Sequence, residues 1–145
     1  MTDVMGYESF SSQVGDDGSP NRAAEIAGQA IRDFNHRTIN ANGHLGWNYP
    51  ADAYRVLGEL YSMAGSLPQA FDQVARFLTR LNHDELVVMD AGGPFEGNTG
   101  AAIEMACQEL TAARQHAHNL YAALAAAQAA ISRASYNGGP DVDED

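Results

Sequence analysis

The sequence predicts an all-α protein: a four-helix bundle with a long C-terminal helix, between disordered N- and C-terminal tails. Apolar residues recur at three- and four-residue spacing through most of residues 19–135. The one strand-like run, residues 86–89, is short and has no second strand to pair with. The periodic segments are separated by helix-start and helix-stop residues, such as Ser19-Pro20 and Gly92-Gly93-Pro94.

The first predicted helix begins at Ser19-Pro20, with the serine as N-cap and the proline in the first turn. We expect it to run to about Thr38. Its apolar residues fall on one broad face: Ala23, Ile26, Ala27, Ala30, Ile31 and Phe34. A loop from Asn40 to Asn48 follows, and it carries the only tryptophan, Trp47.

Two shorter helices are expected next. One begins at Asn48-Tyr49-Pro50 and is broken at Gly65-Ser66, with Tyr54 and Tyr61 on a shared flank. The other restarts at Ser66 and Pro68 and continues to Leu81. The connection of about two residues predicts an antiparallel helical hairpin.

The fourth predicted helix, residues 99–135, is capped by Asn98 or Thr99 and carries a seven-residue repeat. One row of the repeat consists of Ile103, Leu110, Ala117, Leu124 and Ile131, and its companion of Ala106, Ala113, Leu120, Ala127 and Ala134. A helix of this length extends about 50 Å, roughly twice as far as the three shorter helices. Either the short helices are staggered along it, or part of its apolar stripe faces another chain.

Length and charge restrict the class of protein. The 145 residues suit one domain, and we expect residues 1–18 to be a disordered segment, residues 19–136 the bundle and residues 137–145 a disordered acidic tail. The net charge of −11 excludes the basic stripe of a general nucleic-acid-binding protein and disfavours anionic membranes. No apolar run is long enough to span a bilayer, so a cytoplasmic location is expected.

No grouping of catalytic or metal-binding residues is recognisable, so we predict no cofactor, no metal and no enzymatic activity. Cys107 is the only cysteine, which excludes an internal disulfide and a cysteine-based zinc site. His116 and His118 point about 200° apart on a helix and cannot bind one metal together. The glycine-containing loop 92–100 lacks the lysine of a phosphate-binding loop.

The function predicted from these features is a protein-interaction or structural module that binds itself or a protein partner. Its candidate contact residues are the aromatic and stripe residues Trp47, Tyr54, Tyr61, Ile103, Leu110, Leu120, Tyr121, Leu124 and Ile131. One alternative is an acidic decoy or regulator that occupies a basic site on a nucleic-acid-binding protein. Another is a small-molecule site near the Trp47 loop, formed with His44, Tyr49 and Tyr54.

Three short segments carry a resemblance: Tyr49-Pro50-Ala51-Asp52, Val56-Leu57-Gly58-Glu59-Leu60 and Leu67-Pro68-Gln69-Ala70. They resemble small Ala/Arg-rich helical proteins of actinomycetes, for which no activity is assigned. All eight basic residues of this chain are arginine, as in a GC-rich genome. The resemblance implies a helical fold and lends no catalytic residue.

Overall fold

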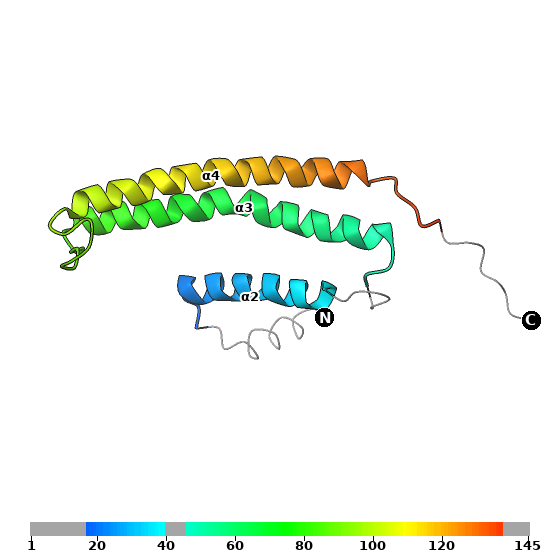
Figure 1. Ribbon diagram of the computed structural model, residues 1–145, viewed down its shortest axis with the longest axis horizontal. Helices are drawn as coiled ribbons and strands as arrows, with labels where there is room; N and C mark the ends of the chain where they lie inside the picture. Colours follow the sequence, from blue (N-terminus) through cyan, green and yellow to red (C-terminus); the bar gives the residue numbers. More distant parts are fainter. Residues whose placement is uncertain (1–16, 40–45, 138–145) are drawn as a thin grey trace, which may run out of the picture. The chain divides into compact units, whose positions relative to one another are not determined.

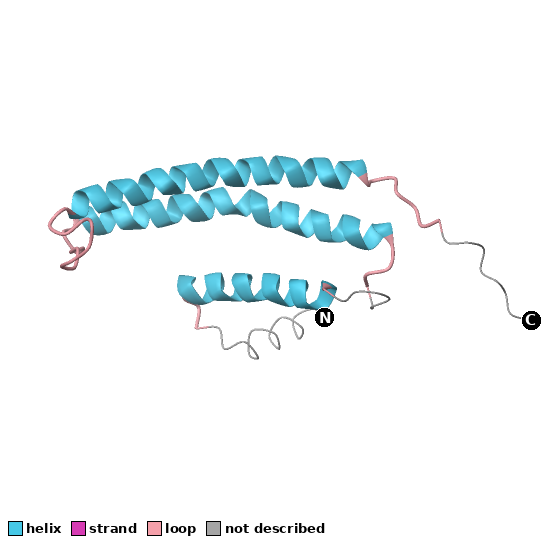
Figure 2. Cartoon of the chain, in the orientation of Figure 1, coloured by secondary structure: helices cyan, strands magenta, loops and turns pink. Residues whose placement is uncertain are grey.

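The computed structural model describes residues 17–39 and 46–137, and in these it contains three helices and no strand (Figure 1). The helices are α2, Pro20–Thr38; α3, Pro50–His83; and α4, Thr99–Ala130 (Figure 2). The all-α prediction is therefore confirmed, whereas the four-helix bundle is wrong for the described part of the chain. Most of the two predicted tails, and His44 in the predicted loop, lie outside the described residues.

Contacts within the chain divide it into two units, with the boundary between Asn48 and Tyr49. The first unit carries α2 and the second carries α3 and α4. In the second unit α3 and α4 run antiparallel and pack along each other, so they form a helical hairpin (Figure 1).

Helix α2 begins as the sequence predicts. The Ser19 hydroxyl accepts a hydrogen bond from the Arg22 amide at 3.1 Å, and Pro20 occupies the first turn, where its missing N–H costs nothing. The Ser19 amide in turn donates to the Asp17 carboxylate at 2.9 Å, and this bonding lowers the pKa of Asp17. None of the α2 residues is buried.

Helix α3 continues through Gly65, Ser66 and Pro68, so the predicted break is wrong. Pro68 has no N–H to donate to the Ala64 carbonyl, which normally bends or ends a helix. Here α4 contacts α3 on both sides of the proline, at Gly65 before it and at Asp72 after it. These contacts offset the lost hydrogen bond, and α3 bends gently instead of ending (Figure 1).

The loop 84–98 connects the two long helices. At its start Glu85 has a positive φ of 57°, and the Leu86 amide donates to the Leu81 carbonyl at 2.9 Å. This is the usual helix stop with a left-handed residue, here without the usual glycine. Residues 86–89 form no strand, and the Asn98 side chain caps α4 by accepting from the Ala101 amide at 3.2 Å.

The lengths of the two helices correct a second expectation. With 34 residues in α3 and 32 in α4, both extend about 50 Å at 1.5 Å per residue. Fusion of the two predicted short helices into one gives α4 a partner of its own length. The apolar stripe of α4 therefore does not extend beyond α3. Any apolar surface that a partner could cover lies elsewhere on the hairpin.

Candidate protein-interaction surface

The contact line between α3 and α4, which we call the seam, is built from four α4 side chains, three of which lie between two α3 residues four apart. Cys107 Sγ lies 3.7 Å from Thr79 Oγ1 and 3.9 Å from the Ala75 carbonyl oxygen. Gln128 donates to the Tyr54 carbonyl at 3.2 Å and covers Gly58, as a Cβ added there would lie 2.8 Å from Gln128 Nε2.

Tyr121 lies between Tyr61 and Gly65 in the middle of the seam. The rings of Tyr61 and Tyr121 stack with their centroids 4.1 Å apart and 25° between their planes, and their hydroxyls share a hydrogen bond. This hydrogen bond, with smaller contributions from desolvation and from the charge of the neighbouring phenolate, raises the pKa of Tyr61. The fourth contact of the same row is the ion pair between Arg114 and Asp72 at 2.9 Å.

The predicted heptad register of α4 is only partly right. The row that contains Ile103 and Ala117 does face α3, because these two side chains are buried. Its companion on the seam is the polar row Cys107, Arg114, Tyr121 and Gln128, which an apolar pattern could not reveal. The seven-residue spacing of Tyr54 with Tyr61 and of Gly58 with Gly65 was the sequence signal for it.

Apolar residues next to the seam lie on one side of the hairpin. On α3 one row follows seam positions by three residues and a second row precedes them by one, and on α4 a row precedes them by one. All three rows turn away from the seam in the same sense. An antiparallel helix pair has an approximate two-fold axis perpendicular to the plane of the pair, so equal turns reach the same side. We call this side the hairpin face: Leu57, Leu60, Ala64, Leu67, Phe71, Val74 and Leu78 of α3, with Ala106, Ala113, Leu120 and Ala127 of α4.

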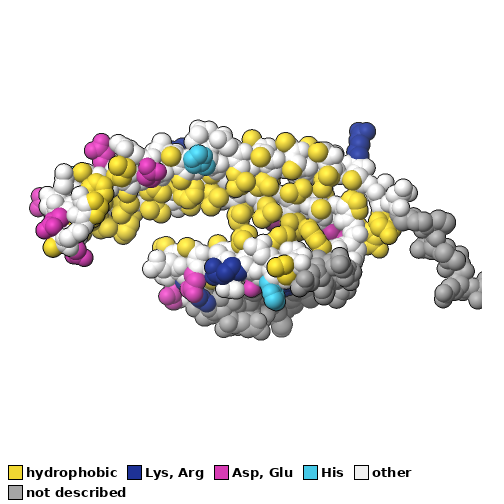
Figure 3. Space-filling model, viewed as in Figure 1, with side chains coloured by type: hydrophobic (Ala, Val, Ile, Leu, Met, Phe, Trp, Pro, Cys, Tyr) yellow, Lys and Arg dark blue, Asp and Glu magenta, His cyan; other side chains and the backbone are white. Residues whose placement is uncertain are grey.

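The hairpin face is poorly covered. Of its residues only Ala64 is buried; Val74 is 48% exposed, Leu120 is 43% exposed, and the other leucines and Phe71 are half-buried. Among the described residues no large side chain anywhere is fully buried. Figure 3 shows hydrophobic side chains along most of the hairpin, with few charged ones among them. An apolar surface of this extent is typical of an interaction site.

The structure separates the predicted contact residues. Tyr61 and Tyr121 stack on each other. Four aliphatic members are covered at least in part, since Ile103 is buried and the other three are half-buried: Leu110, Leu124 and Ile131. Leu120, in contrast, is exposed on the hairpin face. Tyr54 is 40% exposed, and its backbone oxygen accepts from Gln128. The remaining member, Trp47, belongs to the first unit.

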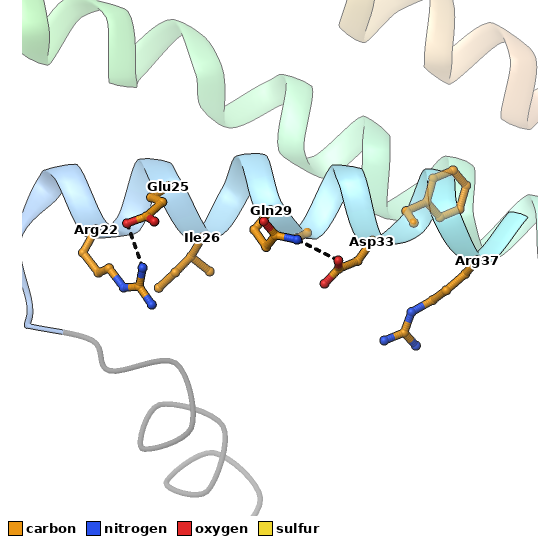
Figure 4. A pocket seen from close by; sticks show the side chains of 8 residues that line it. Arg22, Glu25, Ile26, Gln29, Asp33 and Arg37 are labelled. Carbon is orange, nitrogen blue, oxygen red and sulfur yellow. Dashed lines mark hydrogen bonds and ion pairs between the residues drawn. The ribbon is translucent and has the colours of Figure 1, made fainter. Parts of the chain in front are cut away.

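In the first unit, Trp47 is half-buried and packs edge-on against Phe34, with ring centroids 6.0 Å apart. An open hollow runs along α2, lined by polar and apolar side chains in alternation (Figure 4). Two polar pairs lie along the helix: Arg22 forms an ion pair with Glu25 at 2.7 Å, and the Gln29 amide donates a hydrogen bond to the Asp33 carboxylate at 2.8 Å. These pairs are typical of a solvated helix surface.

A second hollow, on the polar side of the hairpin, is lined by Arg76, Arg80 and His83 around Thr79 and Cys107. Residues 17–39 and 46–137 contain no group of three His, Cys, Asp or Glu that could hold a metal ion. None of the helices in the described ranges has an apolar stretch long enough to cross a membrane.

Comparison with known proteins adds no relative: no protein-family model matches the chain, and no curated protein or solved structure is significantly similar to it.

Proposed function

We propose that the chain is a non-catalytic protein-interaction module that binds itself or another protein through the hairpin face. The observation that supports this is the exposure of Val74 and Leu120 beside half-buried leucines on one side of two 50 Å helices. Covering a large apolar side chain is worth about 1.5–3 kcal/mol. A surface with several such side chains is therefore stabilised by association with a partner.

The acidic-decoy alternative has less support, because the charge of the hairpin helices is nearly balanced. They hold five acidic residues against four arginines, which are Asp52, Glu59, Asp72, Glu104 and Glu109 against Arg55, Arg76, Arg80 and Arg114. A decoy of nucleic acid needs a continuous acidic face. No observation favours the small-molecule alternative, since Trp47 packs on Phe34.

The proposal is tested by placing one charge on the hairpin face. Leu120→Glu adds a carboxylate at an exposed position of that face. Ala122→Glu is the matched control: it adds the same charge at an exposed position two residues on, which lies about 200° away around the helix and so on the opposite side of α4. Sedimentation equilibrium measures self-association, and capture by the immobilised full chain measures binding of other proteins. We expect Leu120→Glu to lose binding and Ala122→Glu to retain it. Equal binding by the wild-type chain and both variants would contradict the proposal.

A further inference from the structure

We infer that the occupant of the hairpin face is a second copy of this chain, packed so that α3 of each copy lies on α4 of the other. This inference rests on the proposed function and names its partner. The two-fold axis of such a dimer runs parallel to the helices, so every helix has antiparallel neighbours. Three features of the hairpin are relevant to this arrangement: its length, the pattern of large and small side chains, and the position of the acidic residue at the rim of the face.

The first feature is the size of the surface. Two helices about 50 Å long and each about 10 Å wide present about 1,000 Å² on one side. A stable protein–protein interface needs about 800 Å² from each partner. A single helix of 19 residues, the length of α2, extends about 28 Å and would cover only about half of that length. A second hairpin matches the whole face.

The second feature is that, at four levels of the hairpin face, a large side chain of one helix is paired with a small side chain of the other. Because Tyr121 lies between Tyr61 and Gly65, the preceding residue of α4, Leu120, is level with Ala64 of α3. The contacts of Gln128 and Cys107 fix two further levels, and the seven-residue spacing of Arg114, which pairs with Asp72, gives a third. At these levels a large residue of α3 is paired with an alanine of α4: Leu57 with Ala127, Leu78 with Ala106, and Phe71 with Ala113.

These levels make the face complementary to itself. A two-fold interface places the same patch on both sides, so a bulky position must meet a small one. When α3 of one copy lies on α4 of the other, each level holds two large and two small side chains. At the fourth level the sizes are exchanged: Ala64 of α3 is fully buried within the hairpin, and α4 supplies the exposed large residue, Leu120, so the volume of the level is kept.

The third feature concerns charge at the rim. Glu109 is the one acidic residue that the helical period places beside the face on α4, and it is exposed. By the same levels Val74 of α3, which is 48% exposed, is level with Leu110, so Glu109 lies one residue, about 1.5 Å along the axis, from the level of Val74. Within one hairpin the two residues point to opposite edges. In the dimer, Val74 of each copy adjoins Glu109 of the other.

The test uses opposite charges at the same position. We expect sedimentation equilibrium of the full chain to show a dimer. Val74→Arg, which adds an ion pair with Glu109 of the second copy, should dimerise about tenfold more tightly than Val74→Glu, since each dimer holds two such contacts. In a Glu109→Gln background the difference between the two variants should disappear. Far-ultraviolet circular dichroism verifies that all variants keep the helical content of the wild-type chain.

A wild-type chain that stays monomeric at all concentrations would overturn the inference, and so would a charge difference at position 74 that persists without Glu109. The proposed function fails separately. If the chain is monomeric but captures another protein in a manner that Leu120→Glu abolishes, the hairpin face is an interaction surface and only the second copy is wrong. If Leu120→Glu changes neither measurement, both proposals fall.

Discussion

Tyr121 of α4 lies directly over Gly65 of α3. A Cβ built on Gly65 would be 3.0 Å from Cε2 and 3.2 Å from Cδ2 of the Tyr121 ring, which is closer than side chains normally approach. Gly65 is therefore the point at which α3 admits an aromatic ring from α4. The same ring stacks on Tyr61, so its position is fixed from two sides.

The first prediction concerns Gly65→Ala. In a helix interior alanine is favoured over glycine by about 1 kcal/mol. In the wild-type hairpin the new methyl group displaces the Tyr121 ring, so we expect this gain to be cancelled or reversed. In a Tyr121→Ala background the ring is absent and the gain of about 1 kcal/mol should appear. Urea denaturation of the wild-type chain and the three variants measures the difference, and equal effects of Gly65→Ala in both backgrounds would show that the ring does not constrain this position.

The second prediction concerns the pH dependence of the tyrosine pair. The hydrogen bond with Tyr121 raises the pKa of Tyr61 in the folded chain above the value of about 10 for an unfolded chain. The hydrogen bond to the neutral phenol thus stabilises the fold below about pH 10, and this contribution is lost as the pH rises through the folded pKa. Wild-type stability should consequently fall more steeply above pH 10 than that of Tyr61→Phe.

Absorbance titration of the phenolates and urea denaturation check this second prediction. Both are measured between about pH 8 and pH 11, because this range brackets the reference tyrosine pKa. Tyr136→Phe is the matched control, because Tyr136 is 67% exposed and its ring makes a T-shaped contact with the ring of Tyr49. Parallel stability curves for the wild-type chain and Tyr61→Phe would contradict the role of the shared hydrogen bond.

The third prediction concerns Pro68. Replacement by alanine restores an N–H that can donate to the Ala64 carbonyl and removes the steric conflict with the preceding turn. We expect Pro68→Ala to raise the free energy of unfolding by about 1–3 kcal/mol. The control is Pro50→Ala, at the first helical position, which should change stability by less than about 0.5 kcal/mol. Destabilisation by Pro68→Ala would mean that the bend itself is needed for packing on α4.

These residues also explain how far the sequence predicts the structure. Ser19-Pro20 and Asn98 are local signals, since a cap acts on its own first turn, and the helix starts there were predicted correctly. Gly65 and Pro68 are local signals too, but their effect depends on α4, whose residue Tyr121 at the contact with Gly65 lies 56 residues further along the sequence. Tertiary packing overrides the propensity to break the helix. The hairpin, the matched lengths and the hairpin face all follow from that one outcome.

The candidate contact residues divide in the same way. An apolar heptad identifies positions that prefer to be covered, which is why Ile103 and Ala117 are buried. It does not say whether the cover is a helix of the same chain. The row that contains Ile103 and Ala117 is used within the hairpin, whereas Leu120 of the companion row is exposed. Further exposed side chains that the prediction missed, such as Val74, lie on α3.

The last prediction concerns salt. The loop 84–98 carries Asp84, Glu85, Asp90 and Glu96 and no basic residue. In the proposed dimer the two-fold axis runs parallel to the helices, so both loops lie at the same end and repel each other. Added salt screens this repulsion, because the Debye length is only about 10 Å at 0.1 M ionic strength. We therefore expect the dimer to bind severalfold more tightly at about 0.2 M salt than at about 0.02 M salt.

The double substitution Asp90→Asn with Glu96→Gln should tighten the dimer at low salt and reduce this dependence. The glutamine at position 96 keeps an oxygen that can accept the Gly92 amide hydrogen bond, which is 2.9 Å long in the wild-type loop, so the loop conformation is preserved. Sedimentation equilibrium across the salt series provides the measurement. If each copy instead packed α3 against α3 of the other, the loops would lie at opposite ends and the double substitution would leave the salt dependence unchanged.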